Sequence, residues 1–169
     1  MPPTITRILF ATALSERSAW TLRHVIALSA ATGAEIRILH VIEALSEDAR
    51  VTLLAFIQDD VQRTAALSQR LELTRQHLAE RQERFWSSLP PEEQKIRDRV
   101  VATDVVEGFP AEVILNEATR HHCDLIVLGA HERAITHRFL GDTANRVLRH
   151  SAIPTLIVPY HPQQQPEKP

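Results

Sequence analysis

The sequence predicts an α/β fold built on a parallel, doubly wound sheet. Short apolar runs alternate with segments of helical periodicity, which is typical of strands and helices that follow one another along the chain. The runs are continuous instead of alternating in polarity, as expected for strands that are buried on both faces of a sheet. The expected strands cover residues 8–10, 36–41, 100–106, 125–128 and 155–158.

Three helices are expected, at residues 15–32, 110–121 and 142–150. The first helix ends at Gly33, a residue type that commonly terminates helices. Pro110 opens the second helix, where its missing N–H costs nothing. In the third helix, Ala144, Val147 and Leu148 are expected to face the core.

The segment 47–89 is the least typical part of the chain, because it is long and contains no glycine and no proline. Its apolar residues recur at spacings of three and four, which predicts either two helices or one long kinked helix with a break near Gln58 and Asp59. A helical cover on the sheet is the favoured interpretation, and a helix dedicated to a partner is the alternative. Residues 1–160 are expected to form one domain with this long helical insertion. Residues 161–169, rich in proline and glutamine, are expected to be a flexible tail.

Composition excludes several classes of protein. Hydrophobic residues make up 44% of the chain and charged residues 24%, with a formal net charge of -2, so neither nucleic acid nor an anionic membrane is an expected partner. No stretch approaches the length of a membrane span, and the first ten residues are too short and polar for a signal peptide. The single cysteine, Cys123, rules out a disulfide framework and suits a reducing compartment, so a cytoplasmic location is expected.

A ligand site is expected at the carboxyl ends of the strands, where ligands bind in sheets of this kind. Thr12 and Ala13 follow the first strand, and Val41 ends the second. Gly129 ends the fourth strand and would let the backbone approach a ligand closely. His131 lies in the loop that follows, where it could also help to offset the charge of a phosphate.

The last helix begins with Gly141, Asp142 and Thr143. The free N–H groups of a helix N-terminus can bind an anion such as phosphate. The same residue types also form ordinary helix caps. These three residues alone therefore do not distinguish an anion site from a plain helix cap.

The stretches DLIVLGAHERAITHRFLGDTANRVLRHSAIPTLIVPY, ITRILFATALSERS and GFPAEVILNEATRHHCDLIVLG together resemble universal stress proteins. The resemblance covers most of the chain and fits residues 47–98 least well. It implies a five-stranded parallel sheet of order 3-2-1-4-5 with helices on both faces, the Rossmann-like arrangement of adenine-nucleotide alpha-hydrolases. It also implies homodimers formed through the last strand, binding of ATP or AMP in some members, and a role in stress response without a firmly assigned reaction.

The nucleotide-binding members of that family resemble the pattern G-x-x-G, nine residues, then G-[S/T], with an acidic residue in the first loop. Gly129 matches the first glycine, whereas Glu132 stands at the second. Gly141 comes one residue early and is followed by Asp142 instead of serine or threonine. Ala13 stands where the acid would be.

These departures predict a degenerate nucleotide site. The carboxylate of Asp142 would compete with a phosphate for the same N–H groups and repel it, and Glu132 would add a second negative charge. The leading hypothesis is therefore a stress-response protein that acts by binding and has no catalytic residues. One alternative is an ATP- or AMP-binding switch, or a slow ATPase, using Gly129, Gly141 and Thr143. Another is an interaction module acting through the 47–89 helix.

A homodimer is expected through the last strand, which starts at Thr155 and reaches Pro159. An edge strand presents unpaired N–H and C=O groups, and pairing with the same strand of a second chain satisfies both.

The run His121-His122-Cys123 invites a metal interpretation. Neighbouring helical residues point about 100° apart, and the chain has no further cysteine, so a helix C-terminus is the favoured interpretation and no metal is expected. Ser15 is expected to cap the first helix, and Trp20 to belong to the core.

Overall fold

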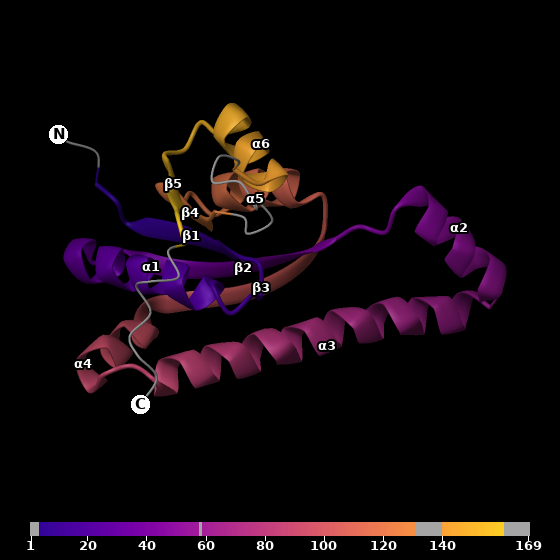
Figure 1. Ribbon diagram of the computed structural model, residues 1–169, viewed down its shortest axis with the longest axis horizontal. Coiled ribbons are helices and arrows are strands. Elements are labelled where there is room, and N and C mark those ends of the chain that lie inside the picture. The colour runs from indigo at the N-terminus through magenta and orange to yellow at the C-terminus, as the bar shows by residue number, and fades with distance from the viewer. Residues whose placement is uncertain (1–3, 58, 131–139, 161–169) are drawn as a thin grey trace.

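The computed structural model describes residues 4–57, 59–130 and 140–160 (Figure 1). The elements are β1 (Arg7–Thr12), α1 (Ser18–Thr32), β2 (Glu35–Glu43), α2 (Glu47–Phe56), α3 (Asp60–Ser87), α4 (Pro91–Gln94), the 3-10 helix η1 (Lys95–Arg99), β3 (Val100–Gly108), α5 (Pro110–Arg120), β4 (Leu125–Gly129), α6 (Asp142–His150) and β5 (Thr155–Val158). The predicted tail, 161–169, lies outside the described residues.

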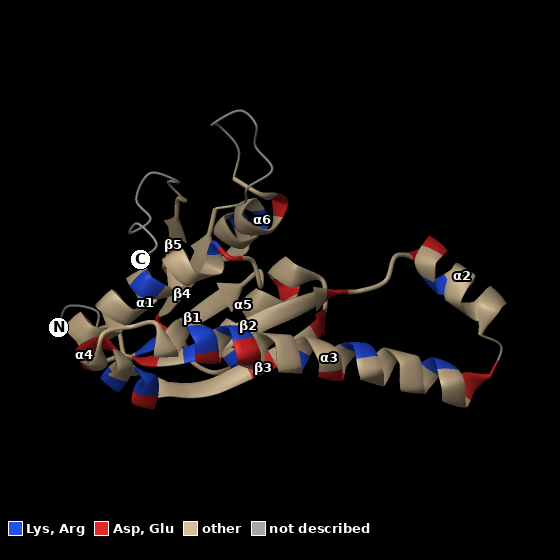
Figure 2. Cartoon of the chain, turned by 60° about the horizontal axis from the view of Figure 1, so that its bottom comes forward, with Lys and Arg blue, Asp and Glu red and all other residues tan. Residues whose placement is uncertain are grey.

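The segment between β2 and β3 consists of two helices, α2 and α3, with the break where the sequence predicts it. Asp59 caps α3 by accepting a hydrogen bond from the N–H of Val61 at 2.8 Å. The favoured interpretation, a helical cover on the sheet, is right only for the second half of α3, where Leu78 and Trp86 are buried. The first half of α3 and all of α2 extend beyond the sheet (Figures 1 and 2).

Length explains this overhang. A helix of 28 residues is about 42 Å long, whereas a nine-residue strand such as β2 spans about 30 Å. We call α2 together with residues 59–73 the arm. Four of its large apolar side chains are exposed, namely Val51, Leu54, Phe56 and Val61. At its end, Leu71 is half-buried and packs against the cluster that contains Ile42 and Val105.

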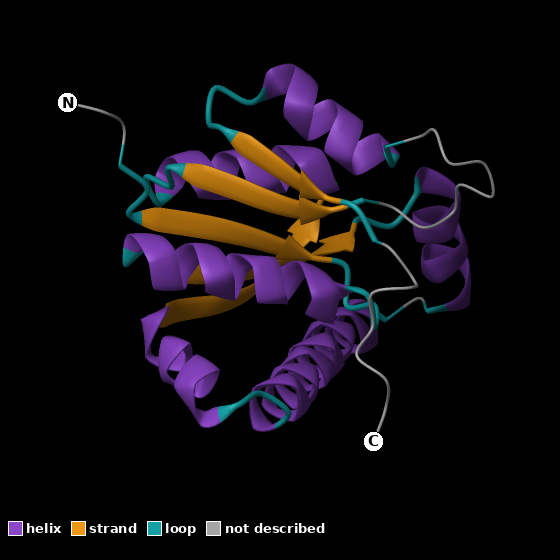
Figure 3. Cartoon of the chain, turned by 60° about the vertical axis from the view of Figure 1, so that its left-hand side comes forward, coloured by secondary structure: helices purple, strands orange, loops and turns teal. Residues whose placement is uncertain are grey.

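The sheet is parallel throughout, with the strand order β3-β2-β1-β4-β5, which confirms the predicted order. Helices cover both faces (Figure 3). β1 lies in the centre, where Phe10 pairs with Ile38 of β2 on one side and with Val127 of β4 on the other. This double cover explains why the strands are continuous apolar runs.

Two large hydrophobic cores result, because neighbouring side chains of a strand point to opposite faces. A third, smaller cluster consists of Ile42, Leu78 and Val105. Ile8 and Phe10 pack against α1 and the end of α3, in the core that contains the 2% exposed Trp86. Leu9 points to the other face and packs with residues of α5 and α6, including Ile114 and Val147.

The start of α1 differs from the prediction. The helix begins at Ser18 and not at Ser15, and its N-cap, Arg17, makes no side-chain capping bond. Ser15 is therefore not the cap; its carbonyl accepts from the N–H of Ser18 at 3.1 Å. The reason lies one residue earlier, where Leu14 has a left-handed φ of 56° and turns the chain before the helix can start.

Two predicted core positions are only partly right. Leu148 is 45% exposed, whereas Ala144 and Val147 are buried as predicted, because α6 buries only a narrow stripe. Trp20 is half-buried against the first core, and its indole N–H donates to the carbonyl of Pro159 at 3.1 Å. Among the described residues, no helix has both the length and the apolar composition needed to cross a bilayer.

Candidate functional site

The carboxyl edge of the sheet brings together the residues that follow β1, β2 and β4. Thr12 pairs with His40, and Val41 comes directly after that pair. Ala11 pairs with Leu128, so Gly129 lies beside Thr12 across the β1–β4 ladder. Three of the strand-end residues expected at the site therefore share one edge, at the centre of the sheet where the winding reverses.

The loop after β1 is held by hydrogen bonds to Thr12. Its Oγ1 accepts from the N–H of Leu14 at 3.3 Å, and its carbonyl accepts from Nδ1 of His40 at 2.8 Å. A carbonyl can only accept, so Nδ1 of His40 carries the proton. Burial lowers the pKa of His40, an effect that the bond to Thr12 opposes, so the ring is neutral near pH 7. Ala13, between these anchored residues, is exposed.

Gly129 has a packing role that the sequence does not reveal. A Cβ on this residue would lie 2.9 Å from Oγ1 of Thr21, closer than real Cβ atoms approach such an atom. Thr21 belongs to α1 and is only 3% exposed. The next residue, Ala130, donates its N–H to the carbonyl of Val158 at 2.9 Å, which ties the end of β4 to β5.

The N-terminus of α6 is formed by Gly141 as N-cap, with φ -60° and ψ 157°, and by Asp142 and Thr143 in the first turn. No side chain among the described residues caps this helix. The first N–H groups of a helix have no partner within it, so they are available to an anion. The exposed carboxylate of Asp142 sits in this first turn, where the helix dipole favours a negative charge.

Val41 is half-buried and packs against the core on the α5 and α6 face. His131, together with Glu132 and the rest of the loop up to residue 139, lies outside the described residues. The structure therefore places Thr12, Val41 and Gly129 along one edge, and it adds two residues that sequence reasoning missed, His40 and Thr21. No sequence pattern links Thr21 to Gly129, since their contact depends on how α1 packs on the sheet.

Residues 121–123 form the C-terminal end of α5, which is the interpretation favoured from the sequence. The N–H of Cys123 donates to the carbonyl of Ala118 at 2.9 Å and that of His122 to Thr119 at 3.1 Å, the pair of bonds of a Schellman motif. His122 takes the left-handed position, with φ 51°. Cys123 is a buried free thiol whose pKa is raised by burial. Within the described ranges, no group of three or more His, Cys, Asp or Glu side chains is arranged to hold a metal ion.

Comparison with known proteins assigns the family. The model of the universal stress protein family matches residues 4–159, so the chain belongs to the universal stress protein family. Its fold is similar to that of a hypothetical protein, MJ0577, solved as a test case of structural genomics, with a TM-score of 0.66 and 22% identity over 95% of this chain and 99% of that one.

Two further solved structures share the fold. Universal stress protein UspA from Lactobacillus plantarum has a TM-score of 0.60 and 22% identity, over 92% of this chain and 99% of that chain. A universal stress protein in complex with cAMP has a TM-score of 0.57 and 18% identity, over 92% and 98% of the two chains.

Proposed function

We propose that this chain is a stress-response protein of the cytoplasm that acts by binding, as a homodimer, and that its nucleotide site is degenerate. The observation that carries the proposal is the position of Asp142 in the first turn of α6, at the helix N-terminus where a phosphate would otherwise bind. Family membership supports a general role in stress response.

The charge of Asp142 weakens phosphate binding in two ways. Its carboxylate interacts favourably with the positive end of the helix and so competes with an incoming anion. It also repels that anion, by about 1 kcal/mol per unit charge at 4 Å in water and more where water is displaced. Because Asp142 is exposed, the repulsion is close to its value in water, which corresponds to about a tenfold loss of phosphate affinity.

Calorimetric titration with ATP, AMP and cAMP in the presence of Mg²⁺ tests the proposal. Cyclic AMP belongs in the series because one protein of this fold was solved with it. We expect dissociation constants in the millimolar range or weaker for all three. Micromolar binding of ATP would contradict the degenerate site and support the alternative, a nucleotide-dependent switch or slow ATPase that uses Gly129, Gly141 and Thr143.

The homodimer part of the proposal rests on β5, the edge strand of the described sheet. Leu156 on this strand is 37% exposed, and an apolar edge strand favours pairing with another chain. Light scattering after size-exclusion chromatography should give a dimer for the wild-type chain and a monomer for Leu156→Lys. Leu148→Lys, on the exposed side of α6, is the matched control and should stay dimeric. A wild-type monomer would contradict this part.

The arm favours a second candidate function, a protein interaction module. Val51, Leu54, Phe56 and Val61 are 52% to 84% exposed, which is unusual for side chains of this size clustered on one segment. Replacing Phe56 and Val61 by serine should leave folding and dimerisation intact and abolish capture of a cellular protein. Unchanged capture by the double variant would contradict this candidate.

A further inference from the structure

A pocket of about 310 Å³ lies between the first half of α1 and the second half of α3. Among the described residues, it shares Thr12 and Leu14 with the loop after β1 described above. Its apolar lining includes four buried residues, Phe10, Leu22, Ile38 and Leu78. Its volume is in the range of natural ligand sites.

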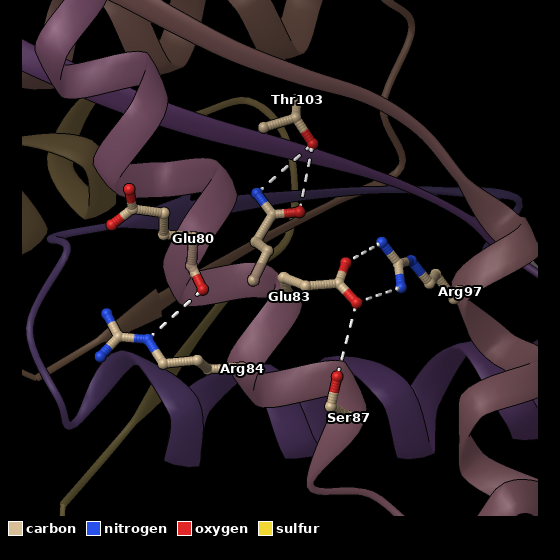
Figure 4. Close-up of polar contacts among 7 residues, drawn as sticks. Glu80, Glu83, Arg84, Ser87, Arg97 and Thr103 are labelled. Carbon is tan, nitrogen blue, oxygen red and sulfur yellow. Dashed lines mark hydrogen bonds and ion pairs between the residues drawn. The ribbon is translucent and has the colours of Figure 1, made fainter.

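Two arginines of α3, Arg81 and Arg84, line the same pocket. Neither is ion-paired with any residue in the described part of the chain. Arg84 donates its Nε–H only to the backbone carbonyl of Glu80, at 3.4 Å. Their neighbour Glu83 cannot neutralise them, because it is engaged by Arg97 at 2.6 Å. Figure 4 shows that Glu83 and Arg84 point away from each other on α3.

Hydroxyl groups add hydrogen-bonding capacity beside the arginines. Ser15, just before α1, and Ser18, at its start, contribute two of them; these hydroxyls lie 3.3 Å apart and bond each other, which leaves one of the two protons for a ligand. The Ser88 hydroxyl also lines the pocket, but it donates to the carbonyl of Phe85 at 2.7 Å and can therefore only accept from a ligand. Of the described residues that line the pocket, Glu16 is the one acid, so two cations face one anion there. An apolar lining with an excess of positive charge is complementary to a molecule with an apolar body and one anionic end.

We propose that this pocket binds an amphipathic carboxylate, with its apolar chain against Phe10, Leu22 and Leu78 and its carboxylate at Arg81 and Arg84. Guanidinium groups suit a carboxylate because they can donate two parallel hydrogen bonds to it. A nucleotide fits less well, since its base and ribose would leave polar groups against the apolar lining. The pocket is distinct from the site at the start of α6, because no residue of α6 lines it.

Calorimetric titration of the full chain with decanoate, and separately with decanol, tests the anionic class of the ligand. Decanoate should bind at one site per chain, about tenfold or more tighter than decanol, which has the same chain without the charge. Arg81→Gln combined with Arg84→Gln should weaken decanoate binding by about tenfold and leave decanol unchanged. Glu16→Gln should tighten decanoate binding. Equal affinity for the two ligands, or an unaffected double variant, would overturn the proposal.

A blocking variant tests the location. Ala19 lines the pocket from an exposed position of α1, so Ala19→Trp should fill it without disturbing a core and abolish binding of decanoate. Ala27→Trp, at an exposed position of the same helix outside the pocket, is the matched control and should bind normally. ATP should not compete with decanoate. Absence of saturable decanoate binding, unimpaired binding by Ala19→Trp, or competition by ATP would each overturn the proposal.

Discussion

A Cβ placed on Gly129 would lie 2.9 Å from Oγ1 of Thr21. Thr21 is buried in the first turn of α1, so a side chain at position 129 would overlap its hydroxyl unless that hydroxyl moved. Packing therefore favours glycine at the first position of the nucleotide motif for a reason that is independent of any ligand. A glycine in a binding motif is weak support for binding when packing already explains it.

Replacing Gly129 by alanine is expected to destabilise the fold by about 1–3 kcal/mol, the usual cost of overpacking. Chemical denaturation measures this loss. Adding Thr21→Ala removes the opposing oxygen, so the double variant should recover part of the stability, and the coupling can be read from a double-mutant cycle. A Gly129→Ala variant with wild-type stability would argue against the packing role.

Asp142→Ser is expected to tighten binding of ATP and AMP by about tenfold, because it removes the charge that competes with phosphate. The same change should lower the free energy of unfolding by about 0.3–1 kcal/mol, since an acid in the first helical turn is stabilising. Calorimetry measures the gain in nucleotide affinity, and chemical denaturation measures the loss of stability. Asp48→Ser, in the first turn of α2, is the control and should leave nucleotide affinity unchanged.

His122→Gly is expected to stabilise the protein. His122 adopts φ 51° at the end of α5, and a left-handed conformation costs a residue with a side chain about 1 kcal/mol that glycine does not incur. The measured midpoint of thermal unfolding should rise by about 2–4 °C. His121→Gly, at the neighbouring position with φ -98°, should instead lower it, because no left-handed strain is relieved there.

The two ends of the 47–89 segment should respond differently to truncation of an aromatic side chain. Trp86 is 2% exposed and fills the first core, so Trp86→Ala should cost about 3–5 kcal/mol. Phe56 is 84% exposed on the arm, so Phe56→Ala should change stability by less than about 0.5 kcal/mol. Comparable losses in denaturation experiments would mean that the arm packs on the domain.

Asp124 is expected to make stability depend on acid pH. Its Oδ2 accepts from Oγ1 of Thr6 at 2.6 Å, from the N–H of Thr6 at 2.7 Å and from that of Arg7 at 2.9 Å. These bonds, above all that from the Thr6 side chain, lower the pKa of Asp124 below 3.8, its ordinary value. Because the folded form has the lower pKa, the contribution is complete well above pH 3.8 and is lost as the pH falls through the lowered value.

Denaturation at several pH values between neutral and strongly acidic measures this dependence in the wild-type chain and in Asp124→Asn. The asparagine cannot ionise, so the stability difference between the two proteins should be largest at neutral pH and shrink in acid. A difference that stays constant over this range would contradict the role of the ionised carboxylate.

Several features could be predicted from the sequence because they depend on local patterns. The apolar runs predicted β1 and β4 as buried strands, and Gly33 marked the end of α1. The run 155–158 is a strand as predicted, but it is not buried on both faces, since Leu156 is 37% exposed. The sequence also predicted a break near Gln58 and Asp59, and Asp59 is the residue that caps α3. The departures of Asp142 and Ala13 from the family pattern are also plain in the sequence.

The contacts between distant segments could not be predicted in this way. Nothing near Ser15 indicates that Leu14 turns the chain and delays α1, since that turn also depends on Leu14 packing beside Ile42 and Leu78. Likewise, the apolar spacing in α3 is similar along its length, yet its fully buried residues, Leu78 and Trp86, lie only in the second half.

The sequence by itself determined the order of strands and helices, the family, and the negative charge at the start of α6. Only the tertiary structure decided that Thr21 fixes Gly129, that Arg81 and Arg84 lie over an apolar pocket, and that the arm leaves Phe56 exposed. The physical reason is that periodicity and capping act between neighbours along the chain. Packing, by contrast, depends on which distant surfaces meet and on how far each element reaches.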